Sequence, residues 1–258
     1  MKIFANIPGF ARLLNSLKYM NVNKKIIEDA KAAGDFERER EYILKSTSVW
    51  GDMVFRMFGS ELTVYGEENL PDHGPVVFIG NHQGYADIIT YFAALKKFQF
   101  GFVAKEELGK LPFFGKWIAR IRSVFIERDD PRASLNAIKK GIEYINDGFS
   151  LVIFPEGTRS RGPEPGPFMK GSTKLATKPG VPIIPVSLNG SYRMFEEEGR
   201  IRGAKISLMI HEPIETKGMS REEEKHLSDR VEKIVVDGVR ELQAREKNSS
   251  SQMTAGDN

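Results

Sequence analysis

A histidine and an aspartate five residues apart are the residues in this sequence best suited to chemistry. His82 and Asp87 follow an apolar run, residues 75–80, that predicts a buried β-strand, and an apolar helical pattern begins after Asp87. At about 3.6 residues per turn, the two side chains can meet. A histidine that a carboxylate orients is a general base near neutral pH. The alternative is structural, with His82 in a loop and Asp87 capping the helix.

Charged residues also follow other predicted strands. Lys105, Arg128, and the pair Glu156 and Arg159 each come shortly after an apolar run. Because the carboxyl ends of parallel strands meet at one edge of a sheet, we expect these groups near His82. A general base beside several cations suits a substrate that carries both a hydroxyl and a phosphate. Two structural alternatives stay open: Glu156 and Arg159 form an ion pair, and Arg128 only pairs with a neighbouring acid.

The sequence lacks the signatures of several other kinds of active site. It contains no cysteine, which excludes a thiol nucleophile, a disulfide framework and a thiolate zinc site. Its four histidines show no metal-ligand spacing, so we expect no metal site. Neither the serine nucleophile elbow nor the glycine-rich phosphate loop occurs. The net charge of +3 is not that of a nucleic-acid-type polycation, and no nucleic-acid partner is expected. The interpretation that needs the fewest additional groups is that His82 activates a substrate hydroxyl, which then attacks directly.

Four short motifs occur in order along the chain. Residues 81–87 carry Asn-His, four further residues and Asp, and residues 125–128 read Phe-Ile-Glu-Arg. Residues 154–160 read Phe-Pro-Glu-Gly-Thr-Arg-Ser, and residues 181–186 read Val-Pro-Ile-Ile-Pro-Val. These segments resemble the first to fourth motifs of the glycerolipid acyltransferases, a family that includes the 1-acylglycerol-3-phosphate (lysophosphatidic acid) acyltransferases, and the third matches throughout. The motifs occur in the family's order, which argues against a chance resemblance. One departure is Gly84, where many members have serine; it leaves the histidine and the aspartate in place.

The resemblance implies an O-acyltransferase that converts lysophosphatidic acid to phosphatidic acid in phospholipid biosynthesis. His82 would take the proton of the sn-2 hydroxyl, whose oxygen attacks the thioester carbonyl of acyl-CoA or of an acyl-carrier protein. Asp87 would orient His82 and stabilise its imidazolium. No cofactor is implied beyond that acyl donor. The acceptor site that the motifs imply comprises Arg128, Glu156, Gly157, Thr158 and Arg159. We add Lys105 to this site from its position after a strand.

Several features of the reaction stay open from the sequence. The oxyanion donor is expected to be a backbone N–H of the turn at residues 81–84 or of the Gly157 loop. Glu156 either bonds the glycerol or fixes an arginine. The acceptor could instead be another lysolipid or glycerol 3-phosphate, and water in its place would make the protein a thioesterase. A non-catalytic lipid-binding protein on the same scaffold is the alternative from another class. The sequence does not choose the acyl donor, the chain length or the oligomeric state.

Strands and helices alternate along most of the chain and would position these residues. Runs typical of strands occur at residues 62–65, 75–80, 98–104, 123–126, 151–154, 182–188 and 204–210, and helical patterns occur at residues 131–146 and 220–245. Such alternation predicts an α/β fold with a largely parallel sheet covered on both faces by helices. The resemblance implies the same: a mostly parallel mixed sheet flanked by helices, which is the glycerolipid acyltransferase fold.

We expect three parts: a helical membrane-docking hairpin at residues 1–59, an α/β acyltransferase domain at 60–246, and a disordered polar tail at 247–258. Residues 1–27 carry basic residues and no acid, with Phe and Leu at helical spacing. This pattern fits an amphipathic two-helix hairpin on a lipid surface, and the alternative is a helix packed on the core. The sequence shows neither a membrane-spanning run nor a signal peptide. We therefore expect a peripheral or monotopic protein on the cytoplasmic face of the cell membrane.

Overall fold

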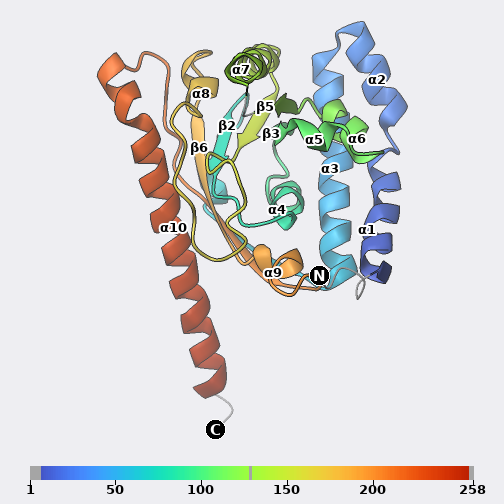
Figure 1. Ribbon diagram of the computed structural model, residues 1–258, viewed down its shortest axis with the longest axis vertical. Helices are drawn as coiled ribbons and strands as arrows, with labels where there is room; N and C mark the ends of the chain where they lie inside the picture. The colour runs from blue at the N-terminus through green and yellow to red at the C-terminus, as the bar shows by residue number, and fades with distance from the viewer. Residues whose placement is uncertain (1–6, 128–129, 256–258) are drawn as a thin grey trace.

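A computed structural model describes residues 7–127 and 130–255 and shows an α/β fold. Within these residues, seven strands form one sheet in the order β1-β7-β6-β2-β5-β3-β4 (Figure 1). The strands are β1 (Glu61–Tyr65), β2 (Val77–Gly80), β3 (Phe100–Lys105), β4 (Val124–Ile126), β5 (Ser150–Ile153), β6 (Ile183–Asn189) and β7 (Lys205–Ile210). All neighbours are parallel except β6 and β7. The predicted mostly parallel mixed sheet is confirmed.

Helices cover both faces of this sheet. The helices are α1 (Ile7–Met20), α2 (Lys24–Ala33), α3 (Phe36–Phe58), α4 (Ala86–Ala94), α5 (Glu106–Gly109), α6 (Phe114–Arg120), α7 (Pro131–Asn146), α8 (Lys174–Thr177), α9 (Tyr192–Phe195) and α10 (Arg221–Ala255), with a 3-10 turn η2 (Glu67–Asn69). Side chains alternate between the two faces of a strand. In β2, Phe78 joins the apolar cluster that contains α3 and α4, whereas Val77 and Ile79 join the cluster of α7, α8 and α10.

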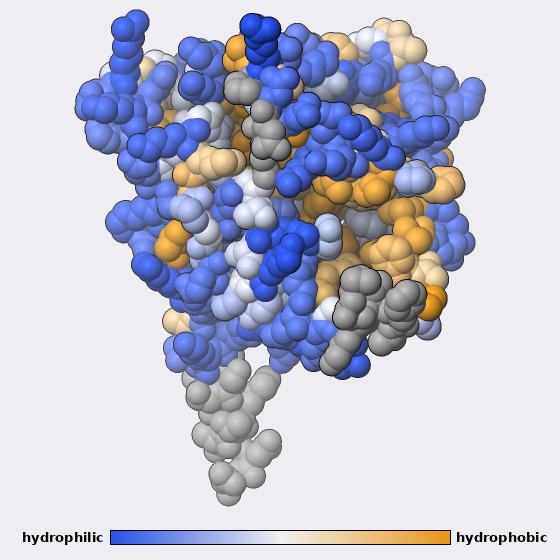
Figure 2. Space-filling view, viewed as in Figure 1, coloured by the Kyte–Doolittle hydropathy of each residue, from blue (hydrophilic) through white to orange (hydrophobic). Residues whose placement is uncertain are grey.

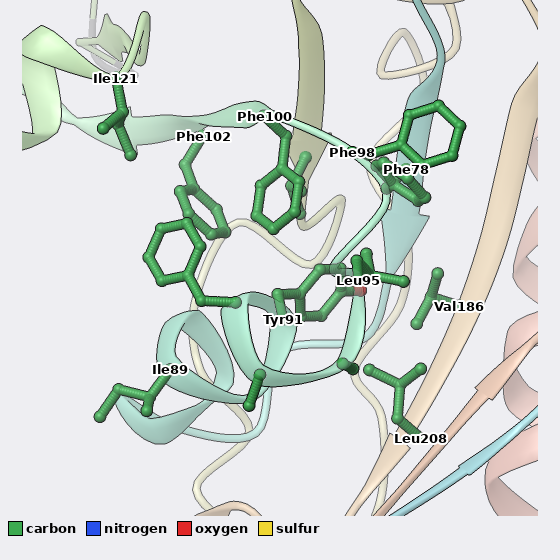
Figure 3. Close-up of a cluster of buried hydrophobic side chains, with 14 of the residues drawn as sticks. Phe78, Ile89, Tyr91, Leu95, Phe98, Phe100, Phe102, Ile121, Val186 and Leu208 are labelled. Carbon is green, nitrogen blue, oxygen red and sulfur yellow. The ribbon is translucent and has the colours of Figure 1, made fainter. Parts of the chain in front are cut away.

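The core on the α4 side is rich in aromatic rings. Tyr91 of α4 lies on the α4 side of Phe100 and Phe102 (Figure 3). Its ring meets that of Phe100 edge-on at 6.3 Å, and Phe92 stacks on Phe100 at 5.3 Å. Each such ring stabilises the fold by roughly 1.5–3 kcal/mol when it is fully buried. This packing fixes α4 on the sheet, and α4 carries Asp87 in its first turn.

The N-terminal region is a set of three helices, so the predicted two-helix hairpin is wrong in its number of helices. The chain between α2 and α3 turns at Gly34, whose φ of 70° is left-handed, and Asp35 caps α3 by accepting from Arg38 N–H. Trp50 of α3 is buried and donates from Nε1 to Ser16 Oγ at 2.9 Å. Helix α3 therefore packs in the core and joins α1 to the sheet. No helix of the described chain combines the length and apolar character needed to cross a membrane.

Helix α10 extends further than the sequence predicts. Its N-terminus is the expected capping box, with Glu223 N–H donating to Ser220 Oγ at 3.3 Å and Ser220 N–H donating to Glu223 at 2.8 Å. The helix continues to Ala255, where the sequence predicts a disordered tail from residue 247. Glu246 accepts hydrogen bonds from Asn189 and Arg193, and these contacts tie the helix to the end of β6. These contacts lie at the last residue of the predicted α/β domain, and the helix runs nine residues past them.

Candidate active site

Three neighbouring strands end at the residues of the candidate site. Strand β2 leads into His82, β5 leads toward Glu156, and β6 leads into Ser191, and β2 pairs in parallel with both neighbours. Their carboxyl ends therefore lie at one edge of the sheet, as the sequence predicts. Backbone bonds tie two of the loops together: Ser160 N–H donates to His82 O at 2.8 Å.

His82 and Asp87 form a hydrogen-bonded pair. The distance from His82 Nδ1 to Asp87 Oδ2 is 2.6 Å, and the Asp87 side chain is fully buried. Asp87 also accepts from Gly84 N–H at 3.0 Å and from Ser191 Oγ at 2.5 Å. A carboxylate that accepts from three directions cannot turn away from the imidazole. With Nδ1 engaged, Nε2 is the ring nitrogen left to act on a substrate.

The plane of the His82 ring is also fixed by packing. The imidazole stacks on Phe154 at a centroid distance of 4.3 Å and an interplanar angle of 9°. Tyr91 in turn meets Phe154 edge-on at 5.6 Å, which links the stack to the aromatic core. The His82 side chain remains 19% exposed, so the pair lies at the surface of the core rather than inside it.

Glu156 braces the backbone of this site. Its Oε1 accepts from His82 N–H at 2.7 Å, and its Oε2 accepts from Gly166 N–H at 2.8 Å. Burial raises the pKa of Glu156, and the two backbone N–H groups act in the opposite direction. Both oxygens are thus engaged by the backbone, and the side chain forms no ion pair with Arg159. Among the residues that the structure describes, neither a bond from Glu156 to an arginine nor the Glu156–Arg159 ion pair is present.

Arg159 has a different partner, which the sequence did not indicate. Its Nη1 donates to Glu196 Oε1 at 3.0 Å, and its guanidinium lies over the ring of Tyr85 at 3.6 Å. Among the described residues, no protein acceptor engages its Nε or Nη2. An arginine offers five N–H donors, so most of them remain for an anion.

The other residues predicted for the site, as far as the structure describes them, form no side-chain hydrogen bond or ion pair with His82 or Asp87. Thr158 is exposed in the same loop, and Gly157 has a left-handed φ of 69°. The Gly157 N–H donates to Phe154 O at 3.1 Å, so this one N–H of the loop is engaged within the protein. Lys105 is exposed at the end of β3, at the same sheet edge, with β5 between it and β2. Arg128 lies outside the described residues.

The sequence profile of the family described as Acyltransferase matches residues 61–189. The chain belongs to the acyltransferase family. The crystal structure of the 1-acyl-sn-glycerophosphate (LPA) acyltransferase PlsC from Thermotoga maritima is similar to it, with a TM-score of 0.69 and 33% identity. That similarity covers 91% of this chain and 97% of the Thermotoga chain.

Curated relatives carry the same kind of name. The 1-acyl-sn-glycerol-3-phosphate acyltransferase of Borreliella burgdorferi is 30% identical over 179 residues, which are 69% of this chain and 71% of the relative. The chloroplastic 1-acyl-sn-glycerol-3-phosphate acyltransferase BAT2 of Brassica napus is 34% identical over 154 residues, 58% of this chain. The match spans only 44% of that relative, and the same share of its Arabidopsis thaliana counterpart.

The sequence did not indicate the role of Asn81, which it placed in the first motif, or the presence of Ser191 and Glu196 in this site. The Asn81 side chain bonds the backbone of the neighbouring strand β6: its Nδ2 donates to Leu188 O at 2.9 Å, and its Oδ1 accepts from Leu188 N–H at 2.8 Å. Ser191 and Glu196 flank the short helix α9, which has no detectable periodicity. The available signal was positional: β6 belongs to the fourth motif and ends at the same sheet edge, so polar residues just beyond it were candidates.

Proposed function

We propose that this protein transfers an acyl chain to the sn-2 hydroxyl of 1-acylglycerol 3-phosphate, giving phosphatidic acid. The observation that carries the proposal is the oriented imidazole of His82. Its Nδ1 is held by buried Asp87 while the side chain stays partly exposed, and Arg159 lies nearby with unused donors. The names of the relatives and of the Thermotoga maritima structure support this acceptor.

In the proposed reaction, His82 Nε2 accepts the proton of the sn-2 hydroxyl as the oxygen attacks the thioester carbonyl. Asp87 stabilises the imidazolium that forms, because its charge lies 2.6 Å from Nδ1. The tetrahedral intermediate then collapses, the C–S bond breaks, and the thiolate takes the proton back from Nε2. In this proposal no residue of the protein becomes acylated. The only other reactant is the acyl-CoA or acyl-carrier-protein donor, and the proposed reaction uses no cofactor or metal.

The phosphate of the acceptor would be bound by the cations at the sheet edge. Arg159 is pre-positioned by Glu196 and Tyr85 and offers its Nε and Nη2. Lys105 adds charge from the end of β3, and Arg128 follows β4 in the sequence. Exposed Thr158 has a hydroxyl for the same anion. Glu156 serves this site indirectly, since its two oxygens hold the His82 and Gly166 backbones.

A lipid substrate requires access to a bilayer, and the N-terminal helices supply a surface for it. Ile7, Phe10 and Leu14 are exposed on α1 at helical spacing. Figure 2 shows apolar surface on the side of the molecule that carries the N-terminal helices and α5–α6. An amphipathic helix of this kind lies in the membrane interface, with basic residues toward the headgroups. We propose a monotopic protein on the cytoplasmic face of the membrane.

A product assay tests the proposed function. The protein is offered lysophosphatidic acid, several other lysolipids and glycerol 3-phosphate, each with acyl-CoA and with acyl-carrier-protein donors. We expect phosphatidic acid from lysophosphatidic acid, and loss of nearly all product in His82→Ala with the unfolding midpoint unchanged. A higher kcat/KM for another acceptor would replace the proposed substrate, and release of free fatty acid alone would indicate a thioesterase.

A further inference from the structure

Glu196 connects two parts of the site with a single oxygen atom. Its Oε1 accepts from Arg159 Nη1 at 3.0 Å and from Tyr85 N–H at 2.9 Å. The side chain is only 7% exposed, and burial raises the pKa of Glu196 while the Tyr85 N–H opposes that rise. A shared, largely buried oxygen is unlike an exposed surface pair, because its position is restricted by both donors.

The two donors belong to the two functions of the site. Tyr85 immediately precedes α4, whose first turn carries Asp87, and its ring lies under the Arg159 guanidinium. Arg159 is the cation placed to receive the phosphate. Glu196 therefore fixes the distance between the turn before Asp87 and the proposed phosphate-binding arginine, although among the described residues no hydrogen bond or ion pair joins it to His82.

Gly84 makes room for this arrangement. A Cβ at Gly84 would lie 2.3 Å from Glu196 Oε2 and 2.7 Å from its carboxyl carbon, well inside van der Waals contact. Glu196 Oε2 is buried and has no hydrogen-bond partner among the described residues, so its position depends on the space that residue 84 leaves free. Gly84 does not have the left-handed φ that would strain another residue, so the constraint at this position is the carboxylate.

We propose that Glu196 is a positioning residue that holds Arg159 and the Tyr85 turn in register for a phosphate-bearing acceptor, in a space that Gly84 leaves open. The inference rests on the proposed function and adds to it a residue outside the four motifs. Without Glu196, Arg159 keeps its charge but loses the partner that orders its long side chain before the substrate arrives. Loss of Glu196 therefore weakens binding of the acceptor. It leaves the catalytic base in place, because Asp87 and Glu156 still hold His82.

The kinetic test compares Glu196→Ala, Glu196→Gln and Gly84→Ala with the wild type. Removing a hydrogen bond to a charged group changes binding by about tenfold, so we expect Glu196→Ala to raise the KM for lysophosphatidic acid by that factor. We expect kcat to stay within about threefold. Glu196→Gln should raise KM less than Glu196→Ala does, since its amide oxygen can still accept from Tyr85 N–H. Glu197→Ala is the matched control, because Glu197 pairs with Arg202 on the surface and should leave KM unchanged.

The double variant Gly84→Ala/Glu196→Ala makes the test specific. Gly84→Ala alone should raise KM as Glu196→Ala does, because its methyl group displaces the carboxylate. In the double variant the methyl group enters vacated space, so KM should equal that of Glu196→Ala alone rather than the product of both effects. An unchanged KM in Glu196→Ala, a fall in kcat alone, or multiplicative effects in the double variant would overturn the proposal.

Hydrogen exchange separates this inference from the proposed function, since it needs no turnover. The Tyr85 amide should exchange about tenfold faster in Glu196→Ala than in the wild type, because its acceptor is gone. Calorimetry of lysophosphatidic acid with His82→Ala, with and without Glu196→Ala, should show about tenfold weaker binding in the double variant. Equal exchange and equal binding would overturn the positioning role, whereas a wild type that neither binds nor acylates lysophosphatidic acid would overturn the proposed acceptor.

Discussion

At the scale of single residues, three independent contacts hold His82 in place with Nε2 available. Asp87 engages Nδ1, Phe154 stacks on the ring face, and Glu156 holds the backbone N–H of the same residue. A tilt of the ring out of its plane would break the stack on Phe154, and a flip within that plane would break the bond to Asp87. The base is therefore organised before any substrate binds, which lowers the cost of reaching the reactive geometry.

Asp87→Asn tests this organisation. The amide fits the same space, but its NH₂ can face Nδ1 and favour the tautomer with the proton on Nε2, which cannot accept a hydroxyl proton. We expect kcat for acyl transfer to fall by roughly 10³–10⁴-fold with the unfolding midpoint changed little. Ser191→Ala is the control, since it removes one donor to Asp87 and keeps the carboxylate; its loss should be about tenfold or less. Comparable rates for Asp87→Asn and wild type would show that Asp87 does not set the tautomer.

At the scale of elements, the strands were predictable and the connections between them were not. Continuous apolar runs such as residues 151–154 mark buried parallel strands, and each predicted strand overlaps an observed one. The helix α9 has only four residues, too few to show a helical spacing of apolar side chains. The turn at Gly34 that divides α2 from α3 lies within a highly charged segment whose pattern predicts one continuous helix. In the site, the motifs indicated Arg159, but its partner Glu196 is 37 residues away and only the fold joins them.

His211 links three elements and makes stability depend on pH. At the end of β7, its Nε2 lies 2.8 Å from Ser187 Oγ of β6, against Gly238 of α10. Burial lowers the pKa of His211, and Glu241 of α10 acts in the opposite direction. A lowered folded-state pKa means that the unfolded chain takes the proton first. The stability from neutral His211 is thus present above its ordinary value of 6.5 and is lost as the pH falls below it.

Urea unfolding at pH 7.5 and 5.5 measures this loss. We expect the free energy of unfolding of the wild type to fall by at most about 1.4 kcal/mol over this interval, because pH 5.5 lies only about one unit below the ordinary pKa of 6.5. His211→Gln keeps a polar group against Ser187 and removes the titration, so its fall over the same interval should be smaller. His226→Gln alters an exposed histidine of α10 and serves as the control. An identical pH dependence in wild type and His211→Gln would exclude this group as the cause.

At the scale of the whole molecule, the catalytic site and the proposed lipid-binding surface are joined by packed helices. Helix α3 packs on α4, and its Trp50 contacts Phe92 of α4 and Ser16 of α1. The proposed lipid-binding surface is thus attached to the helix that carries Asp87, not to a separable appendage. Deleting residues 1–58 would remove core side chains such as Trp50 and Val54 together with that surface. Point substitutions on α1 are the sharper test of membrane binding.

The triple variant Ile7→Ser, Phe10→Ser and Leu14→Ser removes exposed apolar groups of α1 and leaves buried Ser16 and Met20 in place. Burying one such side chain in an apolar environment is worth roughly 1.5–3 kcal/mol, so we expect a loss of at least about tenfold in binding to anionic vesicles. Co-sedimentation measures it. Leu135→Ser is the matched control: Leu135 is 56% exposed on α7, compared with 51% for Leu14. Full sedimentation of the triple variant, or an equal loss in Leu135→Ser, would mean that α1 does not bind the membrane.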